Sequence, residues 1–208
     1  MNIPIIYEDN WLLAVNKPSG LLTIPTPKKE QRTLTSILNE DLEQRGLSYR
    51  LHPCHRLDRE TSGLIIYAKG KSMQRKMMEI FGQKKIKKTY LAFVQGLLSD
   101  SEGEIRNPLE GKIAITKYRV MEKRKGFSIV EIMPLTGRTN QIRIHFKQIN
   151  HPIVGEDRFS FRKDFSLKFK RLCLHAKELE FEHPITKRKI WVNSEMPCDL
   201  KNFLTAHP

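Results

Sequence analysis

The fold of this chain is organised around residues 55–68, which read His55-Arg56-Leu57-Asp58-Arg59-Glu60-Thr61-Ser62-Gly63-Leu64-Ile65-Ile66-Tyr67-Ala68. Residues 61–63 are turn formers, and the apolar run 64–68 is typical of a short buried strand. Asp58 therefore lies between two arginines on a loop that leads into a core strand, where a rigid scaffold can aim it into a cleft. The alternative is a surface Arg–Asp–Arg cluster that only holds a turn.

The composition indicates a globular protein with an anionic partner. The chain has 208 residues, enough for a sizeable core, and we expect residues 1–208 to form a single domain. Hydrophobic residues make up 39% and charged residues 29%, which excludes a disordered chain. The formal net charge of +14 favours nucleic acid as the partner. No stretch approaches the roughly 20 apolar residues that span a bilayer, so we expect no membrane partner.

The N-terminus and the cysteines predict a cytoplasmic protein. Residues 1–4 lack the basic and apolar segments of a signal peptide. The three cysteines are odd in number and scattered, as expected for free thiols in a reducing compartment; they are Cys54, Cys173 and Cys198. Their spacing to nearby histidines matches no standard zinc pattern, so we expect no metal site.

The hydrophobic pattern predicts an α+β fold. Short apolar or alternating runs predict strands at residues 3–7, 12–15, 64–68, 89–94, 116–121, 127–133, 172–181 and 190–193. Helical spacing predicts helices at 34–42, 72–81 and 197–205. Thr33 is the expected N-cap of the first helix and Gly46 its C-terminal stop. Strands joined mainly by short turns favour a largely antiparallel mixed sheet with flanking helices.

The order of residues 55–64, with His-Arg-Leu-Asp before Thr-Ser-Gly-Leu, resembles the active-site motif of the RluA-type RNA pseudouridine synthases. Four further stretches resemble family elements, at 7–22, 88–92, 135–145 and 151–159. The resemblance implies the pseudouridine synthase fold with a central RNA-binding cleft. Because it begins almost at residue 1, we expect a stand-alone catalytic domain without the N-terminal accessory RNA-binding domain of some members.

The resemblance also implies three catalytic residues. Asp58 matches the family's catalytic aspartate, and Arg143 matches the arginine that pairs with it. A neighbouring guanidinium lowers the pKa of a carboxyl, which would keep Asp58 anionic. Tyr90 matches the tyrosine that packs against the target base, since a flat ring with a polar tip can stack on uracil and form a hydrogen bond. Without the resemblance, a strand tyrosine is more simply a core residue.

Further residues are implied as RNA contacts. Arg56 matches the arginine that fills the gap left by the flipped-out uridine, although a loop salt bridge is the alternative. Arg138 and Gln141 would touch phosphate or support their loop. Asn140 stands where many members have histidine, and because asparagine cannot carry charge, an acid–base role there is in doubt.

Isomerising uridine requires no cofactor, no metal and no nucleotide triphosphate, and a single aspartate suits it either as nucleophile on the sugar or as base. One rival is a non-catalytic RNA-binding protein, which gains nothing from an anion in an RNA groove. The other is a nuclease or glycosylase, which would require a metal cluster, a histidine pair or a second carboxylate. We therefore expect a pseudouridine synthase.

The substrate is expected to be tRNA or rRNA, and the sequence does not separate the two. The basic stretch 161–171 could set that choice, on the evidence of its charge alone. The nucleophilic and elimination mechanisms at Asp58 also stay open. We expect a monomer.

Overall fold

The structure is a computed structural model that describes residues 3–27, 30–159 and 167–208. It contains two compact units, Met1–Lys87 with Glu178–Ser194 and Lys88–Lys177 with Glu195–Pro208. Each unit is described by itself, so the single domain and the central cleft stay predictions. Within the described ranges, no helix is long and apolar enough to cross a membrane.

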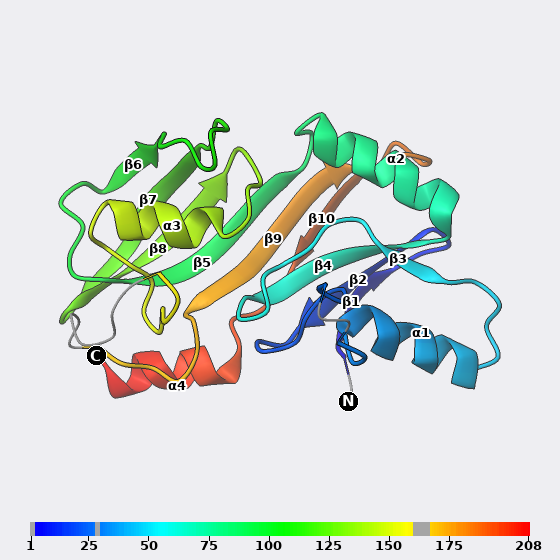
Figure 1. The fold of residues 1–208 in the computed structure, drawn as a ribbon, viewed down its shortest axis with the longest axis horizontal. Helices are drawn as coiled ribbons and strands as arrows, with labels where there is room; N and C mark the ends of the chain where they lie inside the picture. The colour runs from blue at the N-terminus through cyan, green and yellow to red at the C-terminus, as the bar shows by residue number, and fades with distance from the viewer. Residues whose placement is uncertain (1–2, 28–29, 160–166) are drawn as a thin grey trace. The chain divides into compact units, whose positions relative to one another are not determined.

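The first unit is built on a sheet with the strand order β1-β2-β4-β9, in which the β1–β2 and β2–β4 pairs are antiparallel (Figure 1). Its strands are β1 (Ile5–Glu8), β2 (Leu12–Lys17), β4 (Ser62–Lys69) and β9 (Leu174–Glu182), the last of which begins in the second unit. Short β3 (Leu51–Pro53) pairs with β4, and β10 (Lys189–Asn193) pairs with β9. Every residue of β4 except Lys69 is buried, which confirms the predicted core strand.

Two helices of the first unit pack on alternate residues of β4. In α2 (Lys71–Gly82), buried Met73 and Met77 join the cluster that contains Leu64 and Ile66. In α1 (Leu34–Gln44), the hydroxyl of Thr35 lies 3.0 Å from that of Tyr67. Successive strand residues point to opposite faces, so the two helices cover opposite faces of β4 (Figure 1).

The predicted caps of α1 are confirmed. Thr33 accepts a hydrogen bond from the backbone N–H of Ser36, whose side chain accepts one from the Thr33 N–H in return. Gly46 follows the C-cap with a φ of 71°, a conformation that favours glycine. In α2, Met78 is 54% exposed, because it lies more than a third of a turn around the helix from buried Met73.

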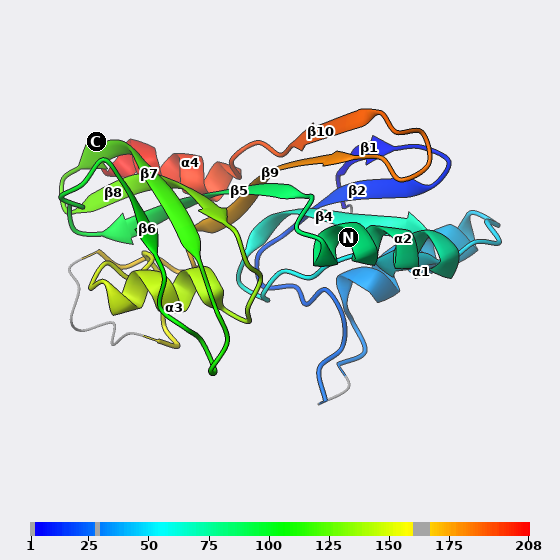
Figure 2. The ribbon, with the colours of Figure 1, turned by 90° about the horizontal axis from the view of Figure 1, so that it is seen from above.

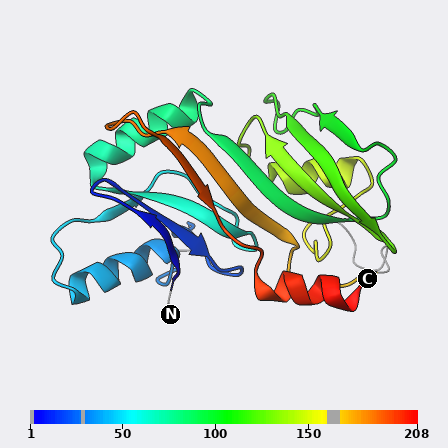
Figure 3. The same ribbon diagram turned by 180° about the vertical axis from the view of Figure 1, so that it is seen from behind.

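The second unit is an antiparallel sheet between two helices (Figures 2 and 3). Its strand order is β9-β5-β8-β7-β6, with β5 (Lys87–Gln95), β8 (Phe127–Pro134), β7 (Thr116–Arg124) and β6 (Glu102–Ile105). On one face, Phe93 and Phe127 pack against Phe203 of α4 (Cys198–Ala206). On the other face, Tyr118 packs edge-on against Phe146 of α3 (Gln141–Gln148).

The α+β class with a largely antiparallel sheet is confirmed, but three elements were not predicted from the pattern. Strand β3 has only three residues, and β6 is mostly exposed and lacks an alternating apolar pattern. Helix α3 was not assigned because its sequence includes the β-branched Ile142 and Ile144. The turn expected at 122–126 is shorter, since β7 runs to Arg124 after a bulge. Of the stretch 161–171, residues 161–166 lie outside the described residues.

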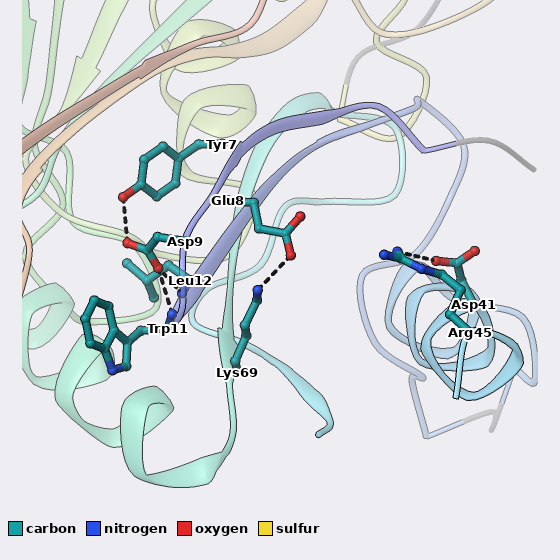
Figure 4. Close-up of polar contacts among 8 residues, drawn as sticks. All are labelled: Tyr7, Glu8, Asp9, Trp11, Leu12, Asp41, Arg45 and Lys69. Carbon is teal, nitrogen blue, oxygen red and sulfur yellow. Dashed lines mark hydrogen bonds and ion pairs between the residues drawn. The ribbon is translucent and has the colours of Figure 1, made fainter. Parts of the chain in front are cut away.

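The carboxylate of Asp9 joins the β1–β2 turn of the first unit to the β9–β10 hairpin. Asp9 accepts hydrogen bonds from the Tyr7 hydroxyl at 2.6 Å and from the backbone N–H groups of Trp11 and Leu12 at 2.7 Å (Figure 4). Nε2 of buried His183 lies 3.2 Å from Asp9 Oδ2 without hydrogen-bond geometry, and burial lowers the pKa of this histidine, so the contact is an ion pair only when His183 is protonated. Burial alone would raise the pKa of Asp9, but the hydroxyl and N–H donors hold it below its ordinary value, and protonated His183 lowers it further.

We predict that Asp9→Asn destabilises the protein by about 1–2 kcal/mol at pH 7, because hydrogen bonds to a charged acceptor are lost. Because the pKa of Asp9 is lower in the folded protein than in the unfolded chain, ionised Asp9 stabilises the fold. This contribution to the free energy of unfolding is fully present above the pKa of Asp9 in the unfolded chain, and it is lost as the pH falls through the pKa of Asp9 in the folded protein. The variant should therefore lose less stability than the wild type between about pH 5 and pH 3. Urea unfolding across this range measures both effects.

The matched control is Asp41→Asn on α1. Asp41 forms an exposed ion pair with Arg45 at 3.4 Å (Figure 4), so its removal should cost less than about 0.5 kcal/mol. Equal losses in the two variants would contradict the role given to Asp9.

Candidate active site

The predicted site residues come from both units. Asp58 and Arg56 lie in the first unit, between β3 and β4. The second unit carries the other four, which are Tyr90, Arg138, Gln141 and Arg143. The two groups are described within their own units.

Backbone contacts on both sides of Asp58 hold its loop in place. The hydroxyl of buried Thr23 donates to the carbonyl of Leu57 at 3.2 Å and accepts from its N–H at 3.3 Å. On the other side, the N–H of Gly20 donates to the carbonyl of Arg59 at 2.8 Å. The Ser19 hydroxyl donates to the next carbonyl, of Glu60, at 2.6 Å. The carboxylate of partly buried Asp58 is therefore carried by a fixed backbone.

Lys17 is the residue on which these loop contacts converge. Its side chain is fully buried, and its ammonium donates to the carbonyls of Pro18, Leu21 and Arg59 at 2.7–3.0 Å. One charge thus joins the chain after β2 to the loop that carries Asp58. The sequence analysis gave Lys17 no role, although its Asn-Lys-Pro setting lay within the stretch 7–22 that resembles the family.

The first residue of the motif, His55, is a structural support. Its Nε2 accepts a hydrogen bond from the N–H of Ile66 at 3.0 Å, and its ring packs on Phe81 with centroids 4.7 Å apart. This bond fixes the start of the loop to β4. The next residue, Arg56, is exposed, as an RNA contact requires.

A buried ion pair holds Arg143 in the second unit. Arg143 is 1% exposed, and its Nε and Nη2 donate to the two carboxylate oxygens of Glu156 at 2.7 Å each. The N–H groups of Arg158 and Phe159 donate to the same carboxylate. Burial alone would raise the pKa of Glu156, but Arg143 and these N–H groups hold it below its ordinary value.

Glu156 was not predicted from the sequence, because no local spacing links it to Arg143. Its position depends on Gly155, whose φ is 80°. A Cβ at Gly155 would lie 1.9 Å from the carbonyl oxygen of Arg171, so only glycine fits beside that backbone. The sequence feature that could have pointed to Glu156 was its position within the stretch 151–159, which resembles a family element.

Asn140 adopts the left-handed conformation at the N-cap of α3, with φ 53° and ψ 23°. Asparagine tolerates this region better than most residues with a side chain. Its Oδ1 lies 3.4 Å from Nη1 of Arg143, which is a long hydrogen bond. Asn140 therefore contributes backbone shape and a weak contact to the arginine.

Gln141 and Arg138 differ in their surroundings. Buried Gln141 accepts from the Thr136 hydroxyl and the Arg138 N–H, and its amide donates to Ile115 and Thr116. These contacts are those of a loop support, one of its two expected roles. The exposed Arg138 donates from Nε to the carbonyl of Ile113 at 3.1 Å, which leaves the predicted phosphate contact untested.

Tyr90 lies on β5 opposite Ile132 of β8, which in turn pairs with Tyr118 of β7. Cross-strand partners share a face of a sheet, so Tyr90 lies on the face that α3 covers. It is partly buried and packs against the core of the second unit. The predicted contact with a base is untested.

Comparison with known proteins decides the family. Residues 11–148 match the family model described as RNA pseudouridylate synthase. The chain belongs to this family. It is 36% identical to the dual-specificity RNA pseudouridine synthase RluA of Vibrio cholerae, over 95% of this chain and 83% of that protein. It is 35% identical to the ribosomal large subunit pseudouridine synthase C of Buchnera aphidicola, over 98% of this chain and 70% of that protein.

A solved structure agrees with the family. The human RNA pseudouridylate synthase domain containing 4 superposes with a TM-score of 0.81 at 24% identity, covering 97% of this chain and 91% of that one. At that identity the likeness shows the fold alone. The predicted fold and enzyme class are thereby confirmed: the protein is an RNA pseudouridine synthase, and its substrate is RNA.

We predict that Glu156→Gln destabilises the synthase by about 2–4 kcal/mol. The substitution removes the carboxylate charge that two nitrogens of the buried Arg143 guanidinium bind, and it turns an amide N–H toward those donors. Urea unfolding at pH 7 measures the loss.

The control is Glu195→Gln, which removes an exposed partner of Lys201 at 3.0 Å and should change stability by less than about 0.5 kcal/mol. If Glu156→Gln were as stable as this control, the ion pair would not be what holds Arg143.

Proposed function

We propose that Asp58 is the catalytic residue of this synthase and that Arg143 is its charge partner. In the reaction, the bond from uracil N1 to the ribose C1′ breaks, the base turns, and C5 bonds to C1′. The proton on C5 leaves to solvent and N1 gains one, so no oxidant or other reactant is consumed. The carboxylate acts at the sugar, either as nucleophile or as base.

The observation that carries this proposal is the fixed loop around Asp58. Lys17, Ser19 and Thr23 bind the backbone at the residues on either side of it, so the carboxylate is held without its own backbone having to reorganise. Positioning of this kind lowers a barrier because the orientation is fixed in folding and not at each turnover. The match of residues 55–64 to the family motif supports the assignment.

We further propose that the target uridine is flipped out of the RNA, stacks on Tyr90, and is replaced in its stack by Arg56. A planar guanidinium stacks on bases, and the exposed position of Arg56 suits it. Arg138, also exposed, would bind phosphate. The two units would act together as one catalytic domain, as a monomer in the cytoplasm.

The RNA substrate is proposed to be tRNA, rRNA or both. One relative is named as dual-specificity and another for the large ribosomal subunit, so the family relationship does not choose between them. The two RNA pools must therefore be tested separately.

The decisive experiment is tritium release from RNA labelled at uracil C5, with bulk tRNA and rRNA in separate reactions. We expect the wild type to release tritium from at least one pool and Asp58→Asn to release at least about 100-fold less, because the amide is neither nucleophile nor base. RNA binding, measured by filter retention, should persist in the variant.

Asp41→Asn is the control, since that carboxylate lies exposed on α1. Equal release by Asp58→Asn and the wild type would refute the catalytic assignment. Tight binding without release by the wild type from either pool would instead favour the RNA-binding rival.

A further inference from the structure

Lys88 has a cationic side chain whose role neither the sequence analysis nor the ion pairs explain. It lies on β5 in the second unit, two residues before Tyr90, and its side chain is partly buried. Among the residues that the structure describes, its ammonium has no hydrogen bond and no ion pair. Burial lowers the pKa of Lys88 below its ordinary value, which reflects the cost of keeping an unpaired charge there.

The surroundings of Lys88 contrast with those of two other lysines. Lys87 reaches Glu180 at 3.5 Å, and Lys17 has three carbonyl partners. A partly desolvated ammonium without such partners is held less favourably than those two, while its remaining exposure leaves it open to a ligand. Lys88 is therefore better explained by an anion that binds from outside than by the stability of the fold.

The position of Lys88 indicates what kind of anion it would meet. Residues two apart on a strand share a face, so Lys88 and Tyr90 both lie on the face that α3 covers. The ammonium is also close to the turn before α3, since a Cβ on Gly137 would lie 3.7 Å from Nζ. That turn continues into Arg138, which is exposed. Lys88 thus stands between the proposed base-stacking residue and the proposed phosphate-binding turn.

We propose that Lys88 binds a backbone phosphate of the RNA beside the target uridine and so positions that uridine on Tyr90. Two residues along a strand separate side chains by about 6.5–7 Å, a span comparable with that of one nucleotide from base to phosphate. A lysine ammonium binds phosphate as a point charge. This inference rests on the proposed function, because it takes RNA as the ligand and Tyr90 as the base contact.

The test compares Lys88→Met, Lys88→Arg and the control Lys201→Met, which removes one exposed lysine of the same unit from α4. The probes are bulk tRNA and rRNA, followed by filter retention and by tritium release. For Lys88→Met we expect the Kd and KM for RNA to rise about tenfold, as for loss of one charged hydrogen bond. The slope of log K against log salt should become shallower by about 0.7–0.9, as for loss of one phosphate contact.

Two further results separate this role from a structural one. Without RNA, Lys88→Met should melt at the same temperature as the wild type or higher, because a desolvated charge is removed. Lys88→Arg should restore most of the affinity, and Lys201→Met should change Kd less than about twofold.

Unchanged affinity and salt slope in Lys88→Met would overturn the inference, as would a loss of folding stability without any loss of affinity. Failure of the wild type to release tritium would count only against the proposed function. The binding measurements would still decide the role of Lys88.

Discussion

A single buried charge, the ammonium of Lys17, is the constraint on which the Asp58 loop depends. Three carbonyls from two separate stretches of chain converge on it, and each such charged hydrogen bond contributes about 1.5–3 kcal/mol. Without the ammonium all three carbonyls would lose this charged donor, although that of Arg59 would keep the N–H of Gly20. The ammonium of Lys17 therefore holds the backbone of the loop that carries the carboxylate of Asp58.

The second unit also contains a buried charged group that holds a proposed catalytic side chain, but there the group is a carboxylate and the side chain is cationic. There the buried guanidinium of Arg143 is held by the carboxylate of Glu156, which two backbone N–H groups also bind. Such a pair adds little net stability, since its desolvation offsets its attraction, but it fixes geometry. In both units a buried charge with full hydrogen bonding positions a proposed catalytic side chain. Lys88 differs because it is partly buried without such partners among the described residues, which is why a ligand is the better explanation for it.

The local features of the fold were predictable where the pattern was strong. The apolar run after Gly63 gave β4, the helical spacing after Thr33 gave α1 with its cap, and alternation gave the β7–β8 hairpin. The elements that were not predicted are those stabilised by tertiary contacts with other parts of the chain. Helix α3 contains two β-branched isoleucines, and its stability comes from packing Ile142 and Phe146 into the core.

The sequence by itself determined the family and the class of reaction, and it predicted the residues that would carry the reaction, because a motif with only two free positions in ten is specific to one kind of active site. It could not determine what supports those residues. Glu156 lies 13 positions from Arg143, and Lys17 lies 42 positions from the carbonyl of Arg59. No local spacing links such partners, since they meet only when the strands pair and a glycine at position 155 passes beside another backbone. The desolvation of Lys88 was likewise decided by the tertiary structure, because burial is a property of everything packed around a side chain.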